Sequence, residues 1–157
     1  GTGSNGTVGH GLSQAPRMVM IKNRDADDSW FVYHFGGWHG AGPAYNYATS
    51  LDTNSTHVGG STHWNSTHPA ATVFSIGTHV GVNTSSEKYI AYCFHSVPNM
   101  TRVSTYRGNQ LADGFYVWTG FAPAFVMTKQ NAGTGNWVMI DNFSIRSNLF
   151  FYYLTHK

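Results

Sequence analysis

A stretch near the start of the chain recurs near its end, and this recurrence constrains the possible folds more than any other sequence feature. Residues 15–22 (APRMVMIK) return as residues 122–129 (APAFVMTK), at an offset of 107 positions. The same offset places Trp137 at the position of Trp30 without a gap. Each copy has the pattern of a strand opened by proline, a polar turn and a second strand led by tryptophan. We therefore interpret the two stretches as copies of one β unit.

The recurrence also predicts how the chain is organised. Residues 1–107 would form a complete first repeat, and residues 108–157 the first half of a second repeat, packed with the first as one unit. Half a repeat lacks some of the strands that should pair with its edges, and open edges invite pairing with another chain. We expect a continuation of the chain or a neighbouring subunit to supply the other half.

Short apolar stretches between Gly-, Asn- and Ser-rich turns predict an all-β fold, a β-sandwich or jelly roll with long loops and almost no helix. Residues 18–22 and 30–35 are predicted to form a hairpin, joined by a turn that contains Asp25, Asp27 and Asp28. We assign no calcium to these aspartates, because the glycine and the distal glutamate of an EF-hand loop are absent. The other predicted strands are 72–76, 88–94, 101–106, 115–119, 124–128, 136–140 and 149–154, with one more around Tyr45, Tyr47 and Leu51.

The composition excludes several classes of partner. Charged residues make up only 10% of the chain and the formal net charge is +2, so we predict no nucleic-acid binding. No apolar run approaches the roughly twenty residues that cross a bilayer, so we predict no membrane insertion. The single cysteine, Cys93, rules out an intrachain disulfide, and we expect it to be a small buried core residue.

Several motifs, taken in order, resemble repeats in bacteriophage tail proteins, many of them from marine phages. The matching segments are GHGL at 9–12, MVMIKNRD at 18–25, VFSIGT at 73–78, YIAYCF at 89–94, YRGN at 106–109, ADG at 112–114 and VWTGFAPAFVM at 117–127. The resemblance covers most of residues 9–142 and is poorer in 36–56 and after 142. It implies a β-rich architecture and a role on the virion surface, and it implies no catalytic residues.

The chain contains nine histidines, which raises the question of a metal site. His57, His63 and His68 fall within one loop, which His39 and His79 could join. Imidazole nitrogens are common ligands of zinc, copper and nickel. Their spacing, however, matches no recognised metal motif. The alternative is that they are exposed loop residues that hydrogen-bond to neighbouring Thr and Asn, and we predict no cofactor.

Aromatic residues in or beside the loop 36–69 suggest a glycan-binding surface. These residues are Trp38, Tyr45, Tyr47 and Trp64. Flat rings stack on the C–H faces of sugars, while Asn, Thr and His side chains bind the hydroxyls. The alternative is that Trp38 and Trp64 cap the ends of a sandwich core. The remaining tryptophans lie on predicted strands, and we expect them in the core: Trp30, Trp118 and Trp137.

Catalysis has little support in the sequence. Only seven acidic residues are present and three share one turn, whereas glycoside hydrolysis needs two placed carboxylates. No nucleophile elbow, phosphate loop or dinucleotide fingerprint occurs. We therefore predict a virion structural protein of a bacteriophage, on a tail fibre, spike or other surface appendage, and not an enzyme.

Such a protein would assemble with copies of itself or with other virion proteins at the extracellular surface of the particle. Contact with host-surface glycans would be a further role. Two alternatives stay open on the sequence alone. The first is a free carbohydrate-binding module or lectin, and the second is a subunit of an extracellular filament.

Overall fold

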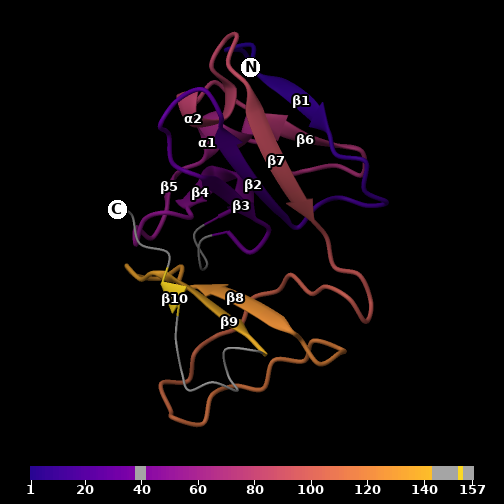
Figure 1. The fold of residues 1–157 in the computed structure, drawn as a ribbon, viewed down its shortest axis with the longest axis vertical. Helices are drawn as coiled ribbons and strands as arrows, with labels where there is room; N and C mark the ends of the chain where they lie inside the picture. Colours follow the sequence, from indigo (N-terminus) through magenta and orange to yellow (C-terminus); the bar gives the residue numbers. More distant parts are fainter. Residues whose placement is uncertain (38–41, 143–151, 154–157) are drawn as a thin grey trace.

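The computed structural model describes residues 1–37 and 42–142 and the backbone of 152–153, and most of its regular elements are short antiparallel strands (Figure 1). The strands are β1 (Gly6–Gly9), β2 (Met18–Asn23), β3 (Phe31–His34), β4 (Tyr47–Ser50), β5 (Val58–Gly59), β6 (Val73–Ile76), β7 (Tyr89–Phe94), β8 (Phe125–Lys129), β9 (Trp137–Asp141) and β10 (Tyr152–Tyr153). Three single turns of helix interrupt them, namely the 3-10 helix η1 (Ala44–Asn46), α1 (Ser61–Trp64) and α2 (Val80–Asn83). The predicted all-β fold is confirmed.

Within the described ranges the strands form three sheets. The largest has five strands in the order β5-β4-β3-β2-β7, a second pairs β1 with β6, and the third has the order β10-β9-β8. Every pairing is antiparallel. In Figure 1 the five-stranded sheet lies between β1 and β6 above and the sheet of β8, β9 and β10 below. This layering gives the molecule its sandwich-like character.

Alternation along β2 and β3 decides which side chains enter the main core. Successive side chains of a strand point to opposite faces. Val19 and Ile21 of β2 therefore share one face of the sheet with Phe31 and Tyr33 of β3. These residues are buried against β6, α1 and α2, which contribute Phe74, Trp64 and Val82.

The opposite face of the same sheet is closed by the hairpin β8–β9. Met20 and Val32 pack there against Trp137 of β9, which is 4% exposed. The indole Nε1 of Trp137 donates to the backbone oxygen of Ser50, at 2.9 Å. The expectation that Trp137 is a core residue is therefore confirmed, and this side chain joins residues 108–142 to the rest of the fold.

The hairpins β2–β3 and β8–β9 have the same residue pairing. In β2–β3, Met18 lies opposite His34, and in β8–β9 Phe125 lies opposite Asp141. Adding 107 to the first pair gives the second. The hydrogen bond from Phe35 N to the oxygen of Arg17, 2.8 Å long, likewise has a counterpart 107 positions later, from Asn142 N to the oxygen of Ala124, at 2.9 Å.

The turns of the two hairpins are closed by corresponding bonds as well. The Nζ atom of Lys22 donates to the backbone oxygen of Asp28, and the Nζ atom of Lys129 donates to that of Gly135. The polar turn predicted between residues 18–22 and 30–35 is confirmed. The carboxylate of Asp25 in this turn accepts a hydrogen bond from the backbone N–H of Lys88 at 2.8 Å, which links the turn to the residue before β7.

Two predicted strands do not form, although both segments lie in the described part of the chain. Residues 101–106 contribute only an isolated bridge between Val97 and Thr101, and residues 115–119 belong to no ladder. Trp118 is consequently 63% exposed, so its assignment to the core was wrong. Trp30 and Cys93 are half-buried and pack at the edges of the two core clusters. Of the predicted strand 149–154, only β10 falls within the described residues.

β1 is a strand that the sequence did not predict, and Asn83 explains part of its placement. This side chain is completely buried, and its Oδ1 accepts from the backbone N–H of Thr2 at 2.8 Å. Its Nδ2 donates to the backbone oxygens of Ser4 and Gly77, at 2.6 and 2.9 Å. The amino-terminal segment is thereby held beside α2, which brings β1 into register with β6.

Candidate functional site

Trp64, one of the predicted glycan-binding residues, belongs to the core. Its side chain is 2% exposed, and its ring meets Tyr33 edge-on at 5.7 Å between centroids. Its Nε1 donates to the backbone oxygen of Tyr47 at 3.0 Å. A ring in this position has no face left for a sugar, so the structure agrees with the alternative, in which Trp64 closes the core. Trp38 and His39 lie outside the described residues.

The two predicted tyrosines are half-buried, and each meets a histidine of the same loop region. Tyr45 contacts His68 edge-on at 4.7 Å between centroids, and Tyr47 contacts His57 in the same manner at 5.0 Å. The hydroxyl of Tyr33 also lies 2.9 Å from Nδ1 of His68. These contacts order the loop region around the core.

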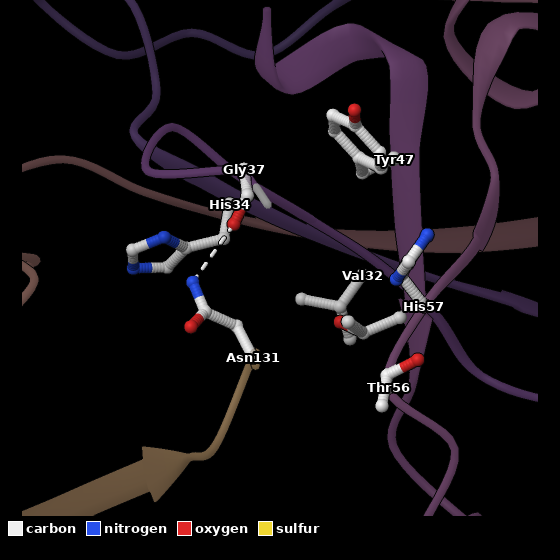
Figure 2. Close-up of a pocket in the computed structure, with 8 residues that line it drawn as sticks. Val32, His34, Gly37, Tyr47, Thr56, His57 and Asn131 are labelled. Atoms are coloured by element: carbon white, nitrogen blue, oxygen red, sulfur yellow. Dashed lines mark hydrogen bonds between the residues drawn. The ribbon is translucent and has the colours of Figure 1, made fainter. Parts of the chain in front are cut away.

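Tyr47 and His57 also line a small cavity between the five-stranded sheet and the loop that joins β8 to β9 (Figure 2). The Nδ2 atom of Asn131 closes one side by donating to the backbone oxygen of Gly37 at 3.1 Å. The cavity volume is about 20 Å³, which suffices for a single water molecule. It is far too small for a sugar ring, so it is a packing feature of the interface between sheet and hairpin.

The loop histidines do not converge on one point. His63 points into the core, His57 packs on Tyr47, and His68 is exposed beside Tyr33 and Tyr45. No three His, Cys, Asp or Glu side chains of the described residues lie close enough together to hold a metal ion. The structure therefore does not bring His57, His63 and His68 together at one point. The reason is that α1 turns His63 into the core, whereas His57 and His68 lie in the segments before and after this helix.

His63 is instead half of a stacked pair. Its ring lies 3.8 Å from that of His79, with an angle of 20° between the planes, and packs on Phe31 at 4.6 Å. Neither of its ring nitrogens has a hydrogen-bond partner among the described residues. Burial, helped by the positive charge that His79 can carry, lowers the pKa of His63 from 6.5 to about 4. Both features favour a neutral ring at physiological pH.

The half-buried imidazole of His34 shares this behaviour. Burial, with a smaller contribution from Arg17, lowers the pKa of His34 to about 4. The pKa of His79 is also lowered by burial, although the nearby carboxylate of Asp28 opposes the shift. The fold therefore holds several histidines that resist protonation.

A larger open groove lies between the ribbon β1–β6 and the edge of the main sheet at β7. Its volume is about 820 Å³, and it has an apolar floor and a polar rim. The floor includes Ile21, Phe74, Ile76, Val82 and Cys93, and the rim includes His10, Arg24, Glu87 and Lys88. Burial raises the pKa of the Cys93 thiol, so the thiol stays protonated and is a poor nucleophile. Strands distant in sequence form this groove, and one of them, β1, carried no sequence signal.

More than half of the large apolar side chains that are exposed in the described part of the chain lie within residues 106–126. These side chains are mostly more than half exposed, and they include Tyr106, Leu111, Phe115, Tyr116, Trp118, Phe125 and Val126. A concentration of exposed large apolar side chains is a common feature of interaction sites. This surface adjoins the edge of β8, which has no partner strand on its outer side among the described residues.

Together, the fold and this surface define an all-β module whose candidate functional feature is an interaction surface. The chain belongs to the family described as a domain of unknown function, DUF7483, whose model matches residues 1–153. Searches of curated proteins and of solved structures find no match. In the described ranges, no helix has the length and apolar character that crossing a membrane requires.

Proposed function

We propose that this chain is a structural module of a bacteriophage virion, located on a tail fibre, spike or other surface appendage. The proposal is supported by the ordered motifs that resemble phage tail repeats, from GHGL at 9–12 to VWTGFAPAFVM at 117–127. A surface with few charges and many neutral hydrogen-bonding groups suits an extracellular particle. The module acts by assembly, and its partners are copies of itself or other virion proteins.

The exposed side of the hairpin β8–β9 is the observation that carries the assembly role. Val126 is 37% exposed and Phe125 is 57% exposed, on a strand whose outer edge lacks a partner in the described part of the chain. Unpaired strand edges are templates for pairing with other chains. The shared register of the two hairpins supports a complete repeat at 1–107 and half of a second one at 108–157.

Carbohydrate binding is the second candidate, and the exposed rings of residues 106–118 favour it. Tyr116 is 86% exposed and Trp118 is 63% exposed, and the guanidinium of Arg102 lies 5.8 Å from the ring centre of Trp118. Flat rings of this kind can stack on sugars. This candidate differs from the sequence-based one, since it no longer depends on Trp64.

Immunogold electron microscopy tests the proposed location. Antibodies raised against the chain are applied to tailed particles and to extracellular filaments, both purified from the culture from which the sequence derives. We expect gold particles on a tail or another appendage of the virion, and no signal after the antibodies are absorbed with the purified chain. Labelling confined to cell-bound or free filaments would contradict the virion role and support the filament alternative.

A further inference from the structure

We infer that the outer side of the hairpin β8–β9 is a docking site for a strand of the β7 type, supplied by a further repeat of this family. The occupant is an extended segment with the alternating pattern of residues 89–94 (YIAYCF), paired antiparallel to β8. The inference rests on the assembly role proposed above and names its surface and its partner. The two hairpins carry the argument.

The first hairpin shows what belongs at this position. There β2 pairs with β3 on one side and with β7 on the other, with Val19 opposite Cys93 and Ile21 opposite Ala91. The second hairpin repeats the pairing of β2 with β3 residue for residue, including the closing bonds of the turn. Only the strand on the far side of β8 is missing among the described residues.

Burial at equivalent positions shows that the second hairpin lacks its cover. The position of Val19, which is 1% exposed, is taken by Val126, which is 37% exposed. The outward-facing positions of the second hairpin are all less buried than their counterparts in the first. Thr128, Val138 and Ile140 are only half-buried, whereas Ile21, Phe31 and Tyr33 are 2%, 8% and 2% exposed. In the first repeat, β6, α1 and α2 provide the cover.

A second segment of the chain also lacks its partner strand, and that partner would come from the same part of a repeat as β7. Adding 107 to the bounds of β1 gives residues 113–116, and β1 pairs with β6. Residues 113–116 form no strand, and Phe115 and Tyr116 are 58% and 86% exposed. The counterparts of β6 and β7 both belong to the second half of a repeat. The second half of one further repeat, which carries both strands, therefore accounts for both open surfaces.

The register of the first hairpin fixes how the occupant should bind. The residue at the Cys93 position of the bound strand should face Val126, and the residue at the Ala91 position should face Thr128. Arg24 N donates to the oxygen of Lys88, so these two residues form a hydrogen-bonded pair. Hydrogen-bonded and non-hydrogen-bonded pairs alternate along an antiparallel ladder, which makes Val19–Cys93 a non-hydrogen-bonded pair. Such pairs have Cα atoms about 4.5 Å apart, which is within the range of a disulfide.

Disulfide trapping tests this register. The full chain carries Cys93→Ser together with Val126→Cys, so that it has one thiol, and the probe is a peptide of residues 86–97 with its own Cys93. In a glutathione redox buffer we expect the mixed disulfide to form at least tenfold faster than in two matched variants. These variants carry Thr128→Cys, one pair further along the same face, or Met127→Cys, on the opposite face. A peptide of scrambled order should react no faster with any variant.

Equal rates at the three positions would overturn the inference, because they would reflect random thiol exchange. Preferential disulfides between two Val126→Cys chains would also overturn it, since the occupant would then be a second copy of β8. If the cysteine variants unfold, the wild-type chain is used with a Cys93→Ser peptide. Slower amide exchange at Phe125, Met127 and Lys129 is then expected, and unchanged exchange would refute the docking site. None of these outcomes affects the immunogold result, so the virion role and the docking site can fail separately.

Discussion

Replacing Trp137 by alanine is expected to lower the free energy of unfolding by about 3–5 kcal/mol, the usual cost of removing a large buried aromatic side chain. The side chain is 4% exposed and packs on Met20 and Val32. Its removal also leaves the backbone oxygen of Ser50 without the donor that lies 2.9 Å away. Two costs therefore add, a cavity and an unsatisfied buried acceptor.

Urea unfolding measures this loss, and Trp118→Ala is the matched control. Trp118 is 63% exposed and belongs to no core cluster of the described residues, so its replacement should change stability by at most about 0.5 kcal/mol. Equal losses for the two variants would contradict the different roles that the structure gives to these tryptophans. A loss of less than about 1 kcal/mol for Trp137→Ala would mean that the hairpin does not close the sheet.

The second large effect is an acid destabilisation that arises from buried histidines. The pKa of His63 is about 4 in the fold, against 6.5 in the unfolded chain. The unfolded chain therefore binds a proton more readily, so stability is full above pH 6.5 and falls as the pH drops towards 4. A shift of this size corresponds to roughly 3 kcal/mol lost by pH 4. Burial also lowers the pKa of His34 to about 4, so this ring adds a contribution of the same sign and similar size.

Unfolding free energies measured between pH 7 and pH 4 check this effect. The variant His63→Leu removes one titrating ring and should lower the slope by roughly half, leaving the part that His34 contributes. The charged and titratable groups that act on the pair are His79, stacked on His63, and Asp28, which acts on His79. The control variant, His68→Gln in the exposed loop, should keep the slope. An unchanged slope in His63→Leu would show that the stacked pair is not the origin.

The sequence was sufficient for elements whose pattern is local. The strands β2 and β3 combine apolar stretches with a polar turn, and the same pattern identified β8 and β9. The assignment of Trp137 to the core followed from its place at the start of a strand. The fold class was predictable for the same reason, since every strong signal in the chain was that of a short strand.

Other features depend on partners that the sequence does not reveal. Residues 115–119 have a strand-like composition, yet a strand needs a neighbour, and the described residues provide none, so Trp118 stays exposed. β1 is the opposite case. Its sequence, GTVG, gives little indication of a strand, and the ladder with β6 makes it one. Trp64 and His63 were assigned to a loop surface from the composition around them. A single helical turn, α1, was enough to bury both.

Amide hydrogen exchange of the monomeric chain, compared between β2 and β8, tests most directly whether the second hairpin is a copy of the first without its outer strand. In an antiparallel ladder, amides alternate between the two neighbours. The hydrogen bonds donated by Arg24 N and Phe35 N show that the amides of Met18, Met20 and Lys22 point towards β7. The hydrogen bond donated by Asn142 N shows in the same way that the amides of Phe125, Met127 and Lys129 point to the open side of β8. We expect strong protection of the first three amides and rapid exchange of the last three, while Val126 and Thr128, which face β9, stay protected. Equal protection of all six amides in the monomer would contradict the account.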